Sequence, residues 1–84
     1  MTVKELRKLL DGIDGDRIVV VSRDEEGNGF NELHQVDAKS VFIRDDSEIY
    51  MERNELTDEL RRNGYSEEDT RTAEDGELCI VLWP

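Results

Sequence analysis

The sequence predicts a small α+β domain, in which an N-terminal helix packs on a mostly antiparallel sheet of roughly three to five strands, with a short second helix before the C-terminal strand. Three observations support this prediction. The chain has 84 residues, which is enough for a single domain (1–84) with one modest core. Apolar residues recur with helical spacing near the N-terminus, and two runs that are apolar on both faces lie near the two ends. Residues typical of turns separate these segments.

The first helix is expected to begin at Thr2. Thr2 and Glu5 have the spacing of a capping box, in which a hydroxyl and a carboxylate accept hydrogen bonds from backbone N–H groups at the helix start. Apolar residues then recur with helical spacing, and Gly12 is placed to end the helix. The apolar stripe of this helix comprises Val3, Leu6, Leu9, Leu10 and Ile13.

Two strands and a hairpin follow from the β-branched and alternating patterns. Residues 17–22 ("RIVVVS") predict a central strand, because both faces of that strand are apolar. Residues 78–83 ("LCIVLW") have the same character, and we expect the two strands to lie side by side under the first helix. Residues 39–52 predict a β-hairpin with Asp45 and Asp46 at its turn. The core candidates of this hairpin are Val41, Ile43, Ile49 and Met51.

Residues 57–64 predict a short second helix before the last strand. Thr57 is a suitable N-cap, two acidic residues follow in the first turn, where negative charge suits the helix dipole, and Gly64 ends the helix. Ser66 and Asp69 then repeat the capping-box spacing, which predicts a further helical turn.

The charge of the chain restricts the classes of molecule that it can bind. Charged residues make up 39% of the chain and the net charge is −11, so the surface repels nucleic acid and anionic lipid. The acidity is uneven, because residues 45–77 hold thirteen acidic and four basic side chains, whereas residues 1–44 hold nine and seven. One interpretation of the acidic second half is a solvated surface that keeps a small chain soluble. The other is a contact surface for a basic partner.

The segment "DEEGNG" (24–29) raises the hypothesis of a metal site. Asp24, Glu26 and Asn28 fall at the first, third and fifth positions of a calcium loop of the EF-hand type. The rest of that pattern is missing, because Gln35 stands where the loop needs a glutamate and a strand is predicted before the loop. The same residues are good turn formers, so a plain loop is the favoured interpretation and a weak calcium site is the alternative.

Cys79 and His34 are the single residues of their types. Cys79 lies in an apolar strand, where cysteine normally behaves as a small, inert hydrophobic residue. The sequence contains no Ser/His/Asp grouping, phosphate-binding Gly-rich loop or histidine cluster, so we expect no catalytic residue, no cofactor and no enzymatic activity. A single cysteine suits a reducing compartment, and the N-terminus lacks the apolar run of a signal peptide or membrane span. The expected location is therefore cytoplasmic.

The segments "MTVKEL", "VVVSRDEEGNGF", "NGYSEED" and "VLWP" occur in this order along the chain. In this respect the chain resembles a group of small uncharacterised bacteriophage and prophage proteins. In that group a short N-terminal helix leads into an acidic Glu-Gly-Asn loop, and the chain closes with an apolar strand that ends in Leu-Trp-Pro. The resemblance covers most of the chain, with residues 32–51 matching least. It implies expression inside a bacterial host and brings no activity or catalytic residue with it.

Two main hypotheses about function follow. The first is an accessory protein that binds a host or phage protein through its acidic second half, where carboxylates spaced like phosphates could mimic DNA in the channel of a nucleic-acid-binding or defence protein. The second is an oligomeric structural or assembly protein, in which a second subunit covers the two-faced strands. A calcium-binding module is the third hypothesis. The candidate partner-binding residues are Asp45, Asp46, Glu48, Glu55, Asp58, Glu59, Glu67, Glu68 and Asp69.

Overall fold

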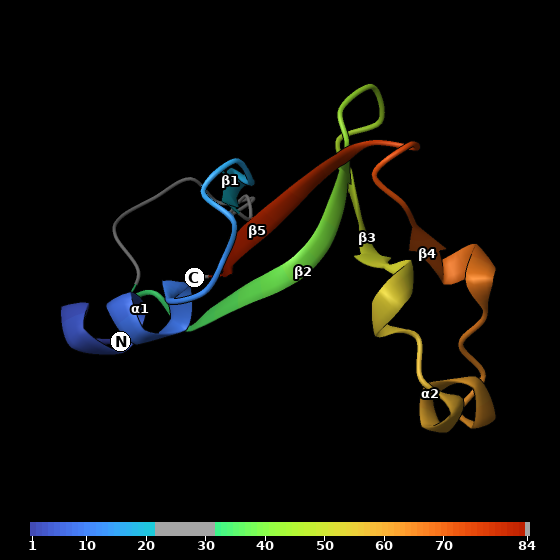
Figure 1. Cartoon of the computed structure of the whole chain (residues 1–84), viewed down its shortest axis with the longest axis horizontal. Coiled ribbons are helices and arrows are strands. Elements are labelled where there is room, and N and C mark those ends of the chain that lie inside the picture. Colours follow the sequence, from blue (N-terminus) through green and yellow to red (C-terminus); the bar gives the residue numbers. More distant parts are fainter. Residues whose placement is uncertain (22–31, 84) are drawn as a thin grey trace.

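A computed structural model describes residues 1–21 and 32–83 of the chain. In these ranges a short N-terminal helix, a five-stranded sheet and a second short helix form the α+β fold that the sequence predicts (Figure 1). The elements in chain order are α1 (Val3–Leu10), β1 (Ile18–Val21), β2 (Gln35–Ile43), β3 (Glu48–Glu52), the 3-10 helix η1 (Arg53–Glu55), α2 (Asp58–Arg62), the 3-10 helix η2 (Glu67–Asp69), β4 (Thr70–Arg71) and β5 (Glu77–Trp83).

The sheet is mixed, with the strand order β1-β5-β2-β3-β4. The three inner strands are antiparallel neighbours, whereas β1 pairs in parallel with β5 and β4 pairs in parallel with β3. The expected neighbourhood of residues 17–22 and 78–83 is confirmed, because Ile18 lies opposite Cys79 in the β1–β5 pair. β5 takes the place between β1 and β2 and is paired on both sides.

The prediction that residues 17–22 form a central strand is wrong, because β1 lies at the edge of the sheet. Val19 and Val21 remain 61% and 67% exposed, respectively. A run of β-branched residues predicts a strand, but its place in the sheet depends on which other strands pair with it. The longer strand β5 pairs with both β1 and β2, and so leaves β1 with one strand neighbour among the described residues.

Helix α1 begins and ends where the local sequence predicts. The Thr2 hydroxyl accepts a hydrogen bond from the Glu5 backbone N–H at 3.1 Å. After Leu10, a turn is closed by the Ile13 N–H, which donates to the Leu10 carbonyl at 3.2 Å. Gly12 has φ +78°, the left-handed angle that the third position of a type II turn requires. Of the strands, α1 contacts β2 most, and Leu10 at its end lines a hollow together with Val19 of β1 and Ile80 of β5.

The β2–β3 hairpin is confirmed, with its turn at residues 44–47. The register places Phe42 opposite Ile49, and residues opposite each other in an antiparallel pair share a face of the sheet. Ile49 and Met51 therefore lie on one face, while Val41 and Ile43 lie on the other. The four core candidates are thus divided between the two faces, and only Val41 is fully buried.

The core lies where β2 and β5 run side by side. Four apolar side chains of the described residues are buried there, together with the polar residue Ser40, while the buried Thr70 lies apart on β4. The pairing of β2 with β5 shifts register between Asp37 and Ser40, which marks a β-bulge. The buried apolar residues are Val41, Cys79, Ile80 and Val81.

A largely buried ion pair crosses the sheet from the edge strand. Arg17, just before β1, donates to the Glu52 carboxylate on β3 at 2.7 Å, and the two side chains are only 8% and 14% exposed. The same guanidinium donates to the carbonyls of Ser40 and Cys79, at 3.4 and 3.1 Å. Arg17 thus binds groups on β5, β2 and β3, and it provides hydrogen bonds to two backbone carbonyls next to the bulge.

The segment between β3 and β4 has the two predicted helical turns. The Thr57 hydroxyl caps α2 by accepting from the Leu60 N–H at 3.2 Å, and Gly64 follows the helix with φ +99°. Ser66 and Asp69 form the predicted capping box around η2, in which the Ser66 N–H donates to the Asp69 carboxylate at 2.8 Å. This segment returns the chain so that β4 pairs in parallel with β3.

Candidate functional site

The acidic candidates fall into two groups at opposite ends of β3. The first group is the hairpin tip, where Asp45 and Asp46 lie in the turn and Glu48 begins β3. The second group lies in residues 53–69, called here the acidic lobe, which comprises η1, α2 and η2 (Figure 1). The acidic lobe holds Glu55, Asp58, Glu59, Glu67, Glu68 and Asp69.

The carboxylates of the acidic lobe differ in what they contact. Asp69 caps η2, and Glu67 lies 3.8 Å from the Arg61 guanidinium. The side chains of Asp58, Glu59 and Glu68 are exposed and form no ion pair with the described residues. These three carboxylates are placed on two consecutive helical turns, where they can meet the cationic groups of a partner.

Several cations near the acidic lobe bind groups other than its carboxylates. Arg53 donates to the Thr70 hydroxyl at 3.2 Å. Arg71 lies over the Tyr50 ring at 3.9 Å and donates to the carbonyls of Glu68 and Thr70. Arg53 and Arg71 therefore bind groups of β4 and β3, while Arg61 and Arg62 are exposed on α2. The acidic lobe holds six acidic and three basic side chains, so its net charge is −3.

Glu48 of the hairpin tip has a local role. Its carboxylate accepts a hydrogen bond from the Tyr50 hydroxyl at 2.6 Å. This hydrogen bond is the main reason why the pKa of Tyr50 is raised above its usual value. At neutral pH Tyr50 is therefore a neutral donor that holds Glu48 along the strand.

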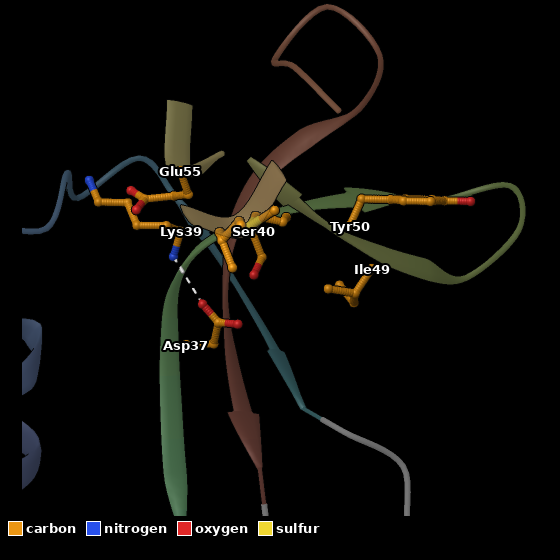
Figure 2. A pocket seen from close by; sticks show the side chains of 8 residues that line it. Asp37, Lys39, Ser40, Ile49, Tyr50 and Glu55 are labelled. Atoms are coloured by element: carbon orange, nitrogen blue, oxygen red, sulfur yellow. Dashed lines mark hydrogen bonds between the residues drawn. The ribbon is translucent and has the colours of Figure 1, made fainter. Parts of the chain in front are cut away.

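An open hollow of about 410 Å³ lies between the β2–β3 hairpin and the acidic lobe (Figure 2). Figure 2 shows Lys39 and Glu55 on the same side of this hollow, with the Tyr50 ring pointing away from them. Asp37 accepts a hydrogen bond from the backbone N–H of Lys39 at 3.3 Å. The lining residues are Asp37, Lys39, Ser40, Ile49, Tyr50, Met51, Glu55 and Leu60.

The lining of the hollow combines apolar side chains with two carboxylates and one cation, Lys39, which lies on the same side as Glu55. Ile49, Met51 and Leu60 can contact an alkyl chain, while Asp37 and Glu55 can bind a cation at its end. A lysine or arginine side chain of a partner has this combination of groups. Sequence reasoning missed the hollow, because its residues come from strands and helices that only the hairpin register and the α2 position bring together.

The candidate calcium ligands Asp24, Glu26 and Asn28 lie outside the described residues, so the calcium hypothesis stays a prediction. Within residues 1–21 and 32–83, no group of three or more His, Cys, Asp or Glu side chains is placed to hold a metal ion.

Cys79 and His34 lie apart on the sheet. Cys79 is fully buried on β5, and burial raises the pKa of its thiol to about 11. The thiol is therefore protonated at neutral pH. His34 is exposed, and its backbone N–H donates to the carbonyl of Trp83 at 2.8 Å, at the other end of β5.

Comparison of the chain with protein-family models, curated proteins and solved structures gave no match. The resemblance to phage and prophage proteins therefore stays a prediction. Among the helices of the described residues, none has the length and apolar character needed to cross a membrane.

Proposed function

We propose that this chain is a small binding protein whose acidic lobe contacts a basic surface of a protein partner. The observation that supports this proposal is the exposure of Asp58, Glu59 and Glu68, which have no cationic partner among the described residues. Carboxylates of this kind raise the rate of association with a basic protein and contribute to specificity. The hairpin tip, with Asp45 and Asp46, is a second acidic contact at the far end of β3.

The partner class that suits this surface is a nucleic-acid-binding protein. Such proteins carry lysines and arginines that neutralise phosphates, and a row of carboxylates can occupy the same cationic groups. In a phage or prophage setting, the chain acts in the bacterial cytoplasm and inhibits a host nucleic-acid-binding or defence protein by mimicking DNA. The hollow beside Glu55 then takes one lysine or arginine side chain of the partner.

The test uses immobilised duplex DNA loaded with proteins from a bacterial lysate. At low salt, the wild-type chain should release specific DNA-binding proteins into solution, which mass spectrometry identifies. A variant with Asp58→Asn, Glu59→Gln, Glu67→Gln and Glu68→Gln should release them at least about tenfold less efficiently, because four of the charges that compete with phosphate are gone. Neutral substitutions are preferable to lysine, because a positive charge in the first turn of α2 would oppose the helix dipole.

The matched control removes four negative charges from the other side of the molecule. Glu5→Gln, Asp11→Asn, Asp14→Asn and Asp16→Asn change exposed residues around α1 and the turn before β1. This control should release the same proteins as the wild type. If the wild type releases nothing, or the lobe variant releases as much as the wild type, acidic mimicry is wrong.

A second candidate function is an oligomeric structural or assembly protein of a phage. The exposed valines of the edge strand β1 favour it, because a second subunit could cover them. Detection of the chain in purified phage particles would support this function, and particles that lack it would count against it.

A further inference from the structure

Among the described residues, the edge strand β1 has a strand neighbour on one side only. It pairs with β5, and no other strand of the described residues lies on its opposite side. Backbone N–H and C=O groups along such an edge can pair with a strand of another chain. Val19 and Val21, at 61% and 67% exposure, leave apolar surface along the same strand.

Natural proteins usually protect an open edge strand with charged residues, proline or a covering segment. The sequence of β1 is Ile-Val-Val-Val, without a charge or a proline. The opposite edge of the sheet differs, because β4 has only two residues, of which Thr70 is fully buried and Arg71 is charged. Of the two edges, β1 is therefore the one that is suited to pairing.

Apolar surface continues from β1 toward α1. A hollow of about 260 Å³ beside the strand is lined by the apolar residues Leu10, Ile13, Val19 and Ile80, and also by Asp14, Gly15 and Arg17. Leu10 is 38% exposed at the end of α1. An apolar side chain from a strand placed against β1 could occupy this hollow and bury the exposed parts of Leu10 and Val19.

The distribution of charge indicates which partner can approach this edge. Residues 1–21 carry four acidic and four basic side chains, and residues 22–31, which follow β1 in the chain, add three acidic and one basic. This part of the chain therefore has a net charge of −2, whereas the whole chain has −11. The acidic lobe lies beyond β3 and β4, at the opposite edge of the sheet (Figure 1). Two copies that meet through β1 therefore keep their acidic lobes at the two far ends, which minimises repulsion.

We infer that the β1 edge is the docking surface for a second copy of this chain. The two β1 strands pair antiparallel about a two-fold axis, so that the sheets of both copies become one continuous sheet. A neutral, apolar edge suits an identical edge better than it suits a strongly basic protein, which would bind the acidic lobe. The dimer presents two acidic lobes, but its formation does not depend on what these lobes bind.

Sedimentation velocity of the full chain tests this inference, over concentrations from about 5 to about 500 µM. The mass should rise from 9.7 kDa toward twice that value. Added salt should strengthen the dimer, since it screens repulsion between two negative chains. The binding of the acidic lobe to a basic partner should weaken with salt, so failure of one proposal can be told from failure of the other.

A variant with Val19→Lys and Val21→Lys should stay monomeric at every concentration, because it places charges on the docking strand. The matched control, Leu9→Lys with Tyr65→Lys, changes residues outside β1 that are 45% and 49% exposed, and should dimerise like the wild type. Circular dichroism checks that both variants fold. A wild type that is monomeric throughout, or a dimer that persists in the β1 variant, overturns the inference.

Hydrogen exchange provides a test that needs no variant. The amides of residues 18–21 in the wild-type chain should become more protected as concentration rises, because antiparallel pairing occupies N–H groups of the open edge. Protection that does not change with concentration would contradict the proposed interface.

Discussion

Position 76, just before β5, can hold only glycine without a shift of the surrounding atoms. A Cβ atom there would lie 2.5 Å from the carbonyl oxygen of Phe42 and 2.7 Å from the Cδ1 atom of Ile43. The β2 backbone therefore approaches Gly76 directly. We predict that Gly76→Ala lowers the free energy of unfolding by about 1–3 kcal/mol, because the added methyl group overpacks this contact. Urea denaturation of both proteins measures the change.

Gly15 is the matched control at the residue scale. A Cβ atom at Gly15 would have no heavy atom within 4 Å, and its φ is not in the left-handed region. Gly15→Ala should leave stability unchanged or raise it by up to about 1 kcal/mol, since it reduces the entropy of the unfolded chain. Equal effects of the two substitutions would show that the close approach at Gly76 is not present.

At the scale of elements, the Arg17–Glu52 ion pair connects the edge strand β1 with β3 across β5 and β2. We predict that Glu52→Gln lowers the free energy of unfolding by roughly 3 kcal/mol, because Arg17 would keep a largely buried charge without its counterion. Thermal and urea unfolding measure this loss. Replacement of both partners, with Arg17→Met and Glu52→Leu, should recover part of the stability, since no unpaired charge remains.

The control for this pair is Arg44–Glu77, which has a similar distance of 2.6 Å but is 67% and 44% exposed. Glu77→Gln should cost less than about 1 kcal/mol, because solvent screens an exposed pair. A loss in Glu52→Gln as small as that in Glu77→Gln would mean that water reaches the Arg17 guanidinium.

At the scale of the whole molecule, the net charge of −11 on 84 residues opposes compaction. We predict that an increase from about 10 to about 150 mM NaCl raises the melting temperature, because the screening length falls from roughly 30 Å to roughly 8 Å. The measurement is made at a low, constant protein concentration, so that association does not contribute.

The variant with Asp58→Asn, Glu59→Gln, Glu67→Gln and Glu68→Gln localises this effect. Its melting temperature should rise less with salt than that of the Glu5→Gln, Asp11→Asn, Asp14→Asn and Asp16→Asn control. The reason is that the four charges removed from it belong to the more acidic part of the chain. Identical salt responses would mean that repulsion within the acidic lobe does not limit stability.

Local signals predicted the features that depend on residues close in sequence. The Thr2 and Thr57 caps, the turn at Gly12 and the Ser66–Asp69 capping box each involve residues only a few positions apart. Their side chains and backbone angles interact wherever the segment lies in the fold, so spacing alone indicates them. The acidic residues of the candidate surface were likewise readable from composition, but their division between hairpin tip and acidic lobe was not.

The sequence by itself determined that this chain has a helix, a hairpin, a second short helix and two strongly apolar strands, because these follow from short-range periodicity and capping. Only the tertiary structure decided that β1 lies at an edge, that β4 pairs in parallel with β3, and that Arg17 reaches Glu52. It also decided that the hairpin and the acidic lobe border an open hollow. The reason is that strand order and side-chain contacts depend on pairing between distant segments, and the same apolar strand can satisfy several different pairings.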